Sequence, residues 1–577
     1  MIPKFNGLEF GIVIGMFGVV TVLGFVATRW HRGGALTDLE EWGLGGRRFG
    51  TVISWFLMGG DLYTAYTFVA VPALLFGTGA AGFFAVPYTI IVFPLVMFVA
   101  ARMWSVCHEH GYATAADFVR GRHGSRVLSL LVAITGIAAT MPYIALQLTG
   151  IRAVFEVMGI GGDWPLWVAF VVLAAFTFTS GLRAPALVAV VKDILIYVMV
   201  LVAVIYIPYK LGGYGHIFHG AQTALAAKGY STLLSGSQYL GYTTLALGSA
   251  LALFLYPHAV TGVLASRSRD VVKKNMSLLP AYTLLLGFIA LLGYMALDAH
   301  VKPVGGTATA PDTTTTVPVL FNDMFPRWVA GVAFGAIVIG ALVPAAIMAI
   351  AAANTFARDI YRPYIRPSGS YRQEVSQYVA MEEGLVSQIV SVLLKLGAVA
   401  VIVSLKLTFA LEFQLIGGVI VIQILPAVVL GLYTRWFHRW ALVAGWIVGM
   451  GLSVYMLYVT KSATAAHFGS ASFALSAWGL HTKATIWTGI VGVAANLIVA
   501  TVLTPLLAWL PRGRDETSPD EMQPAVRIAG PELGLPRSGV QPPYRRQQAT
   551  RPLAGPPRGS VPPGAAAEER GRHRHEA

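Results

Sequence analysis

The sequence is poor in cysteine and in charged residues. Cys107 is its single cysteine, which excludes a disulfide framework within the chain and a metal site built from cysteines. Charged residues make up only 12% of the 577 residues, about half the share usual in soluble globular proteins. The sequence also lacks GxxxxGK[ST], HExxH and G-x-S-x-G motifs. Neither ATP hydrolysis nor an enzymatic function is therefore expected.

Apolar residues are abundant instead. They make up 56% of the chain, and the mean hydropathy is +0.67. Apolar runs recur at about 20 residues, the length that crosses the hydrocarbon layer of a bilayer. The sequence therefore predicts an all-α polytopic membrane protein with about 13 transmembrane helices in contact with membrane lipid. The expected spans are 9–28, 51–76, 83–103, 127–157, 163–181, 187–209, 240–265, 276–298, 328–356, 385–405, 409–432, 439–460 and 484–508.

The basic residues indicate how the chain is oriented. With the N-terminus outside, the inner loops carry twenty Lys and Arg and the outer loops eight. This excess is what the positive-inside rule requires, so the net charge of +14 does not indicate nucleic-acid binding. An odd number of spans then places the C-terminus in the cytoplasm. The segment 511–577 is rich in Pro, Arg, Gly and Ala and is expected to be a disordered cytoplasmic tail, and the outer loop 303–318 has a similar composition.

The second span carries an acid in an otherwise uncharged run. Asp61 follows Gly59 and Gly60 in the stretch ISWFLMGGDLYTAYTF (53–68). A glycine pair weakens a membrane helix, and a broken helix presents free carbonyls to a cation. Because acids inside membrane spans are most often functional, Asp61 is predicted to couple ion movement to transport. The alternative is an acid that only joins two helices.

A second interruption is expected in the seventh span, at ALFLYPHAVTG (252–262). Pro257 removes a backbone donor and clashes with the preceding turn. Two interrupted helices in corresponding positions indicate a transporter built from inverted repeats. The symporter domain is predicted to cover 1–508, with a first half over 51–209 and a second half over 240–432. The segment 9–28 would then be an extra N-terminal helix, and 439–508 would form two extra C-terminal helices.

The candidate substrate-binding residues are polar groups on or beside these interrupted helices. Gln147, in the fourth span, has two possible roles, because buried amides often only hold helices together. His258 could bind substrate or titrate, whereas a buried histidine with satisfied partners is the more common case. The candidates are Tyr63, Thr64, Thr67, Gln147, Tyr256 and His258.

Several motifs together resemble the sodium:solute symporter family. The more specific ones are similar to those of the bacterial monocarboxylate uptake permeases within it. The family motifs are GGRRFG (45–50), GGDLYTAYTF (59–68), YATAADFVRGRHG (112–124), GLRAPALVAVVKD (181–193) and RDIYRPY (358–364). The permease-like motifs are PYIALQLTG (142–150), PAAIMAIAAAN (344–354) and LPAVVLGLYTRWFHRWALVAGW (425–446).

The resemblance implies a LeuT-like five-plus-five core with one extra N-terminal and two extra C-terminal helices. It also implies a sodium site formed by the backbone carbonyls of Gly59 and Leu62, together with hydroxyls of the ninth span. Asp193 matches an aspartate near the cytoplasmic ion exit, although a local pair with Lys192 is an equal alternative. The stretch 331–353 contains no Ser or Thr, so the coupling cation could be Na⁺ or an H⁺ carried by Asp61.

The resemblance implies cation-coupled uptake of a small monocarboxylate such as pyruvate, lactate, acetate or propionate. The expected location is the bacterial inner membrane, no cofactor other than the coupling ion is expected, and the oligomeric state stays open. An alternative is a symporter of the same family for an amino acid or a polyol. A membrane sensor is a further alternative, which the lack of a signalling domain in the tail disfavours.

Overall fold

The computed structural model describes residues 5–29, 38–62, 64–307, 310–366, 375–404, 410–462 and 465–517. The main helices in chain order are α1 (Gly7–Val26), α2 (Leu39–Gly43), α3 (Thr51–Leu62), α4 (Val71–Thr78), α5 (Ala85–His110), α6 (Ala115–His123), α7 (Arg126–Val157), α8 (Trp164–Ser180), α9 (Arg183–Lys210), α10 (Tyr214–Ala226), α11 (Tyr239–Leu253), α12 (Pro257–Leu264), α13 (Arg269–Leu278), α14 (Pro280–Asp298), α15 (Thr316–Met324), α16 (Arg327–Phe356), α17 (Val375–Ser404), α18 (Ala410–Val421), α19 (Leu425–Val428), α20 (Arg439–Val459) and α21 (Thr488–Leu506). Two small antiparallel hairpins pair β1 (Gly306–Thr307) with β2 (Ala310–Pro311), and β3 (Ser472–Ala474) with β4 (Thr485–Trp487).

The long apolar helices show a multi-pass membrane protein. In the described ranges, 10 helices are long and apolar enough to cross a membrane, or up to 11 if the bent pair α11 and α12 is one span. The segment Tyr66–His110 counts once there, but its 45 residues are about twice the length that one crossing needs. Helix α8 is apolar but has only 17 residues. The all-α membrane fold is confirmed, and the number 13 fits but stays a prediction.

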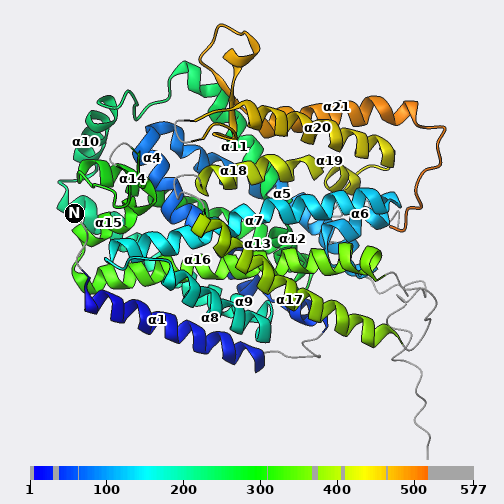
Figure 1. Ribbon diagram of the computed structural model, residues 1–577, viewed down its shortest axis with the longest axis horizontal. Coiled ribbons are helices and arrows are strands. Elements are labelled where there is room, and N and C mark those ends of the chain that lie inside the picture. The colour runs from blue at the N-terminus through cyan, green and yellow to red at the C-terminus, as the bar shows by residue number, and fades with distance from the viewer. Residues whose placement is uncertain are drawn as a thin grey trace, which may run out of the picture. The chain divides into compact units, whose positions relative to one another are not determined.

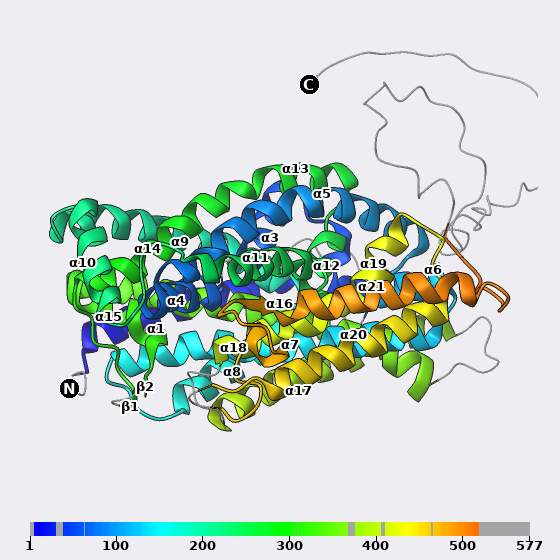
Figure 2. The ribbon, with the colours of Figure 1, turned by 90° about the horizontal axis from the view of Figure 1, so that it is seen from above.

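Most of the long helices, such as α1, α16, α20 and α21, lie side by side along one direction (Figures 1 and 2). Helix α1 lies along one edge of the bundle in Figure 1, and α20 and α21 lie along the opposite edge. Helices α10 and α15 lie at the end where α1 begins, and α6 lies at the other end. The loops that contain α10 and α15, both predicted to be outside, thus share one end of the bundle. The loop that contains α6, predicted to be inside, lies at the other end.

Two segments predicted to lack structure are ordered where they are described. In the loop 303–318, the buried Asp312 accepts hydrogen bonds from the backbone N–H of Thr314 (3.0 Å) and from its hydroxyl (2.6 Å). At the start of the tail, Asp515 pairs with Arg122 (2.7 Å) and Arg435 (3.0 Å). Composition predicted disorder in both places, but carboxylates with good partners fix the chain locally. The rest of the predicted tail, from 518 onward, lies outside the described residues.

Two of the family motifs pack together at the α6 end of the bundle. Asp117 of α6 accepts a hydrogen bond from the guanidinium of Arg358 (3.0 Å) and from the backbone N–H of Ala113 (3.1 Å). The hydroxyl of Thr114 donates to Asp359 at 2.6 Å. Both acids are buried, so these charge-assisted bonds hold α6 against the π-helical segment η7 (Ala357–Ile365) that continues α16.

Candidate functional site

The second predicted span is interrupted, but not at its glycine pair. Helix α3 runs through Gly59 and Gly60 and ends at Leu62, and a π-helical turn, η3 (Tyr66–Ala70), follows before α4. The glycines serve close packing instead. A Cβ on Gly59 would meet the Tyr282 ring at 2.4 Å, and one on Gly60 would lie 3.1 Å from the Lys192 ammonium. The interruption therefore follows Asp61 rather than preceding it.

The interruption predicted in the seventh span is present. Helices α11 and α12 meet at an angle of 47°. Between them Tyr256 is extended, with φ −65° and ψ 139°, and Pro257 begins α12, where its missing N–H has no consequence. Helix α12 contacts α3, so the two interrupted helices meet inside the bundle. The chain therefore brings the end of α3 and the break before α12 close together.

The free backbone groups at the α3 interruption are satisfied by neighbouring side chains. The Gln147 amide oxygen accepts a hydrogen bond from the N–H of Ala65 at 2.9 Å, and its NH₂ donates to the carbonyl of Tyr143 at 3.3 Å. The Thr64 hydroxyl accepts from the N–H of Tyr66 at 3.1 Å. Buried backbone groups need such partners. This geometry supports a positioning role for Gln147 and Thr64, and their contact with substrate stays a prediction.

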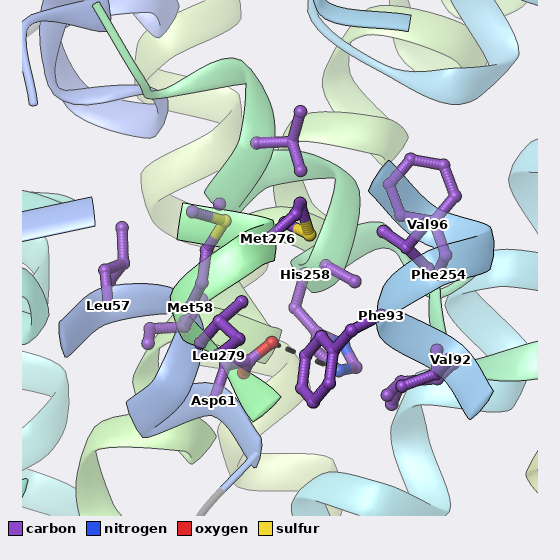
Figure 3. A pocket seen from close by; sticks show the side chains of 15 residues that line it. Leu57, Met58, Asp61, Val92, Phe93, Val96, Phe254, His258, Met276 and Leu279 are labelled. Atoms are coloured by element: carbon purple, nitrogen blue, oxygen red, sulfur yellow. Dashed lines mark ion pairs between the residues drawn. The ribbon is translucent and has the colours of Figure 1, made fainter. Parts of the chain in front are cut away.

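Asp61 and His258 face each other across the two interrupted helices (Figure 3). The Asp61 Oδ2 and the His258 Nε2 lie 3.6 Å apart, and the two side chains are 8% and 1% exposed as whole residues. They are the only polar residues lining the adjacent cavity in the described part of the chain. Its other lining residues are Leu57, Met58, Val92, Phe93, Val96, Leu253, Phe254, Ala259, Gly262, Val263, Met276, Leu279 and Ile347.

Two aromatic rings, those of Tyr143 and Tyr256, adjoin this pair. The ring of Tyr143 lies 5.7 Å from that of Tyr256 and 5.5 Å from that of His258, and the latter two rings are 5.2 Å apart. Within the described structure, neither the Tyr256 hydroxyl nor either His258 ring nitrogen has a hydrogen-bond partner. An unsatisfied buried polar group costs about 1–3 kcal/mol. These atoms are therefore candidates for contact with a bound solute.

Of the remaining candidates, Thr67 lies buried in η3, on the same interrupted span as Asp61. Tyr63 lies outside the described residues, as does the side chain of Leu62. Leu62 is the last residue of α3. Their roles in binding stay predictions.

A second polar cluster lies beside Gly60. The Lys192 ammonium donates to the carbonyl oxygen of Gly60 at 2.6 Å and pairs with the Asp193 carboxylate at 3.0 Å. The Tyr282 hydroxyl donates to the same carboxylate at 2.8 Å. The sequence predicted a span over 187–209, with the Lys–Asp pair near its inner start. Helix α9 begins earlier, at Arg183, so the pair lies further inside the helix, and both side chains are fully buried.

Sequence reasoning missed Tyr282 and the reach of Lys192 across to α3. A lysine inside an apolar run was the available signal. Tyr282 gave no signal, because tyrosines are common in membrane helices.

The wall expected to supply hydroxyls to a sodium ion is aliphatic. Val343 of α16 is 1% exposed and packs with Ile339, Ile347 and Leu57 in one apolar cluster. A hard cation is held by about six oxygens. The described residues of this wall offer no side-chain oxygen, so they do not fit the sodium site that the family resemblance implies.

A multi-pass helical protein with a cavity where two interrupted helices meet has the architecture of a secondary transporter. Residues 42–449 match the family model described as the sodium:solute symporter family. The chain belongs to the sodium:solute symporter family.

The known proteins that the chain resembles include transporters of different solutes. It is 48% identical to a monocarboxylate transport permease protein of Rhizobium johnstonii over 88% of this chain and 98% of the relative. It is 21% identical to the high-affinity proline transporter PutP of Bacillus subtilis, over 72% of this chain and 85% of the relative. The solved structure of a Na⁺-coupled sialic acid symporter superposes with a TM-score of 0.68 at 16% identity, covering 88% of this chain and 99% of that one. This likeness shows the fold, a LeuT-like five-plus-five repeat. The extra N-terminal and C-terminal helices, and the limits of the two halves in this chain, stay predictions.

Proposed function

We propose that the protein is a secondary active transporter that takes up small monocarboxylates together with a cation, Na⁺ or H⁺. The observation that carries the proposal is the cavity at the two interrupted helices, where Asp61 and His258 are the only polar lining residues of the described structure. The 48% identity to a monocarboxylate transport permease points to the same solute class.

The chemistry of the cavity suits a solute with one polar and one apolar end. The apolar walls from α5 and α13 match the short hydrocarbon part of pyruvate or propionate. The His258 imidazole, which lines the cavity, can donate a hydrogen bond to a carboxylate. The unpartnered Tyr256 hydroxyl can do so as well, but Tyr256 lies next to His258 rather than in the cavity lining. A pocket of this kind fixes the solute's orientation with a few polar groups and excludes water with the rest.

An amino acid is the second candidate solute. The Asp61 carboxylate at the cavity would suit an ammonium group, and the proline transporter at 21% identity is a relative of this chain. A polyol has less support, because the described cavity lining contains no amide and no serine or threonine.

Uptake of labelled pyruvate into proteoliposomes, under inward gradients of both Na⁺ and H⁺, tests the proposal. We expect accumulation above that of protein-free vesicles, and competition by unlabelled lactate, acetate and propionate but not by proline or inositol. Tyr256→Phe removes only the hydroxyl and is expected to raise the KM for pyruvate several-fold. Tyr455→Phe, at an exposed position on α20, is the matched control. Competition by proline and not by lactate would favour the amino-acid candidate.

We also propose a bacterial inner-membrane location with the N-terminus outside and the C-terminus in the cytoplasm. The support is the charge asymmetry of the loops and the shared end of α10 and α15. Single cysteines introduced at Lys228 and at Arg126 in a Cys107→Ala background would report the orientation. A membrane-impermeant thiol reagent applied to intact cells should label the first and spare the second. The reverse pattern would contradict the orientation.

A further inference from the structure

We propose that the Lys192 ammonium, bound to the Gly60 carbonyl, is a built-in cation at the end of α3 and replaces the coupling Na⁺ that the family resemblance assigns to the neighbouring carbonyls of Gly59 and Leu62. The protein then carries its own cation there, and transport does not require Na⁺ at this place. The inference rests on the proposed function, because it concerns which cation accompanies the solute.

The first step concerns the helix end. The last four carbonyls of a helix have no partner within it, and in α3 these belong to residues 59–62. They carry the negative end of the helix dipole, which attracts a cation. The Lys192 Nζ lies 2.6 Å from the Gly60 oxygen, so the lysine side chain already satisfies one of these carbonyls.

The second step concerns what holds the ammonium. Asp193 pairs with it at 3.0 Å, and Tyr282 fixes that carboxylate by a hydrogen bond of 2.8 Å. All three side chains are buried, and no Cβ on Gly60 intervenes between α3 and α9. The ammonium is thus held by a charge partner, as buried charges in proteins require.

The third step concerns competition with Na⁺. A second cation about 4 Å from the ammonium would bind about a thousandfold more weakly in a partly buried site. The facing wall of α16, formed by Ile339, Val343 and Ile347, provides no side-chain oxygen to offset this repulsion. The α16 wall thus lacks the hydroxyls that the family resemblance implies as sodium ligands. Because the Lys192 ammonium supplies the positive charge at this helix end, no sodium ligands are needed there. Of the two coupling cations considered, this arrangement favours H⁺.

Uptake by the wild-type protein, with Na⁺ replaced by choline at fixed pH, is the first test. We expect initial rates to change by less than about twofold, since Na⁺ has no place at α3. Loss of most uptake on removing Na⁺ would overturn the inference and leave the proposed transport intact. If no monocarboxylate is taken up, thermal unfolding of the purified protein in NaCl and in choline chloride decides separately. Stabilisation that saturates with Na⁺ would overturn the inference, and equal melting temperatures support it.

Lys192→Met, with Lys395→Met as its matched control, is the second test. Lys395 is also buried in the membrane region, but its ammonium donates to Thr177 (2.5 Å) and Ser391 (3.0 Å), on α8 and α17. We expect Lys192→Met to lose at least tenfold in Na⁺-free uptake and to gain measurable binding of ²²Na⁺, and Lys395→Met to do neither. Unchanged Na⁺-free uptake in a folded Lys192→Met protein would overturn the inference. If the variant does not fold, the wild-type measurements decide.

Discussion

At the scale of single residues, the buried polar groups of the site fall into two classes. The protein itself satisfies those of Gln147, Thr64 and Asp193 with hydrogen bonds to neighbouring groups. It leaves the Tyr256 hydroxyl and the His258 imidazole without hydrogen-bond partners in the described structure. The first class shapes the interrupted helices, and the second is predicted to contact a solute. This division assigns different outcomes to substitutions that lie only a few residues apart.

Asp61→Asn is expected to abolish concentrative uptake while the protein stays folded. The amide keeps the size of the side chain but removes the charge that faces His258 and that ion coupling needs. Asp163→Asn, in a partly exposed pair with Arg152 (3.7 Å), is the control and should accumulate solute normally. The measurement is the steady-state accumulation ratio in proteoliposomes. Normal accumulation by Asp61→Asn would reduce Asp61 to a packing residue.

Gln147→Leu is expected to destabilise the protein by about 1–3 kcal/mol, because the buried N–H of Ala65 loses its acceptor. Gln147→Glu keeps an acceptor oxygen at the same place and is the matched comparison for this hydrogen bond. Thermal unfolding in detergent measures the effect. A Gln147→Leu protein of normal stability with a raised KM would instead assign Gln147 to solute binding.

At the scale of elements, α6 joins parts of the chain that are far apart in sequence. Asp117 and Thr114 attach it to η7, and Arg122 attaches it to the start of the tail. Burial alone would raise the pKa of the Asp117 carboxyl, but the guanidinium groups of Arg358 and Arg120 outweigh it and hold the pKa below its usual value. The same element carries His123, whose Nε2 lies 3.1 Å from the carbonyl oxygen of Ala427 in α19.

His123 is expected to make the protein sensitive to mild acid. Burial lowers the pKa of this imidazole from 6.5 to about 4, with a small opposing contribution from the Ala427 carbonyl. Between pH 6.5 and pH 4 the unfolded chain binds a proton at this histidine more readily than the folded protein does. The free energy of unfolding therefore decreases as the pH falls from about 6.5 towards 4. The full loss is about 3 kcal/mol.

His123→Gln keeps a neutral donor and should flatten the decline of the melting temperature between pH 6.5 and pH 4. His219→Gln, at an exposed histidine in α10, is the control and should follow the wild-type decline. A decline of the same steepness in His123→Gln would place the acid sensitivity elsewhere.

At the scale of the whole molecule, the helices predicted to be extra to the repeat form the two edges of the bundle. Helix α1 forms one edge and α20 and α21 the other, with α12 between them (Figure 1). The buried Glu9 of α1 pairs with Arg327 at the start of α16 (2.9 Å), which ties the first helix to the core. Asp515, among the last described residues, pairs with α6 and with the loop before α20.

Two truncations are expected to separate the ordered part of the tail from the rest. A chain ending at Thr517 keeps Asp515 and should match the full-length protein in uptake and stability. A chain ending at Pro511 leaves the buried guanidinium of Arg122 without that carboxylate and should lose roughly 1–3 kcal/mol. Melting temperatures and yields of the two proteins measure the difference. Equal stability would show that the 512–517 contacts contribute little.

The sequence by itself determined the membrane class, the family and the approximate place of every long helix. These follow from local properties, because a bilayer requires about 20 apolar residues per crossing and excludes unpaired backbone. It also indicated both interruptions, and Pro257 located the second one correctly. It misplaced the first, since a glycine pair predicts a weak helix equally well whether the helix breaks there or packs closely there.

Only the tertiary structure decided which polar groups meet. Lys192 and Gly60 are 132 residues apart along the chain, and no local pattern gives the distance between their atoms. The same holds for Gln147, which lies 82 residues from the N–H of Ala65 that it satisfies, and for Asp61 and His258. Burial then gives these contacts their energetic weight, because a charge or a hydrogen-bonding group removed from water must find its partner within the protein. That requirement acts through the packing of the helices, and so the bundle, rather than any one span, fixes the site.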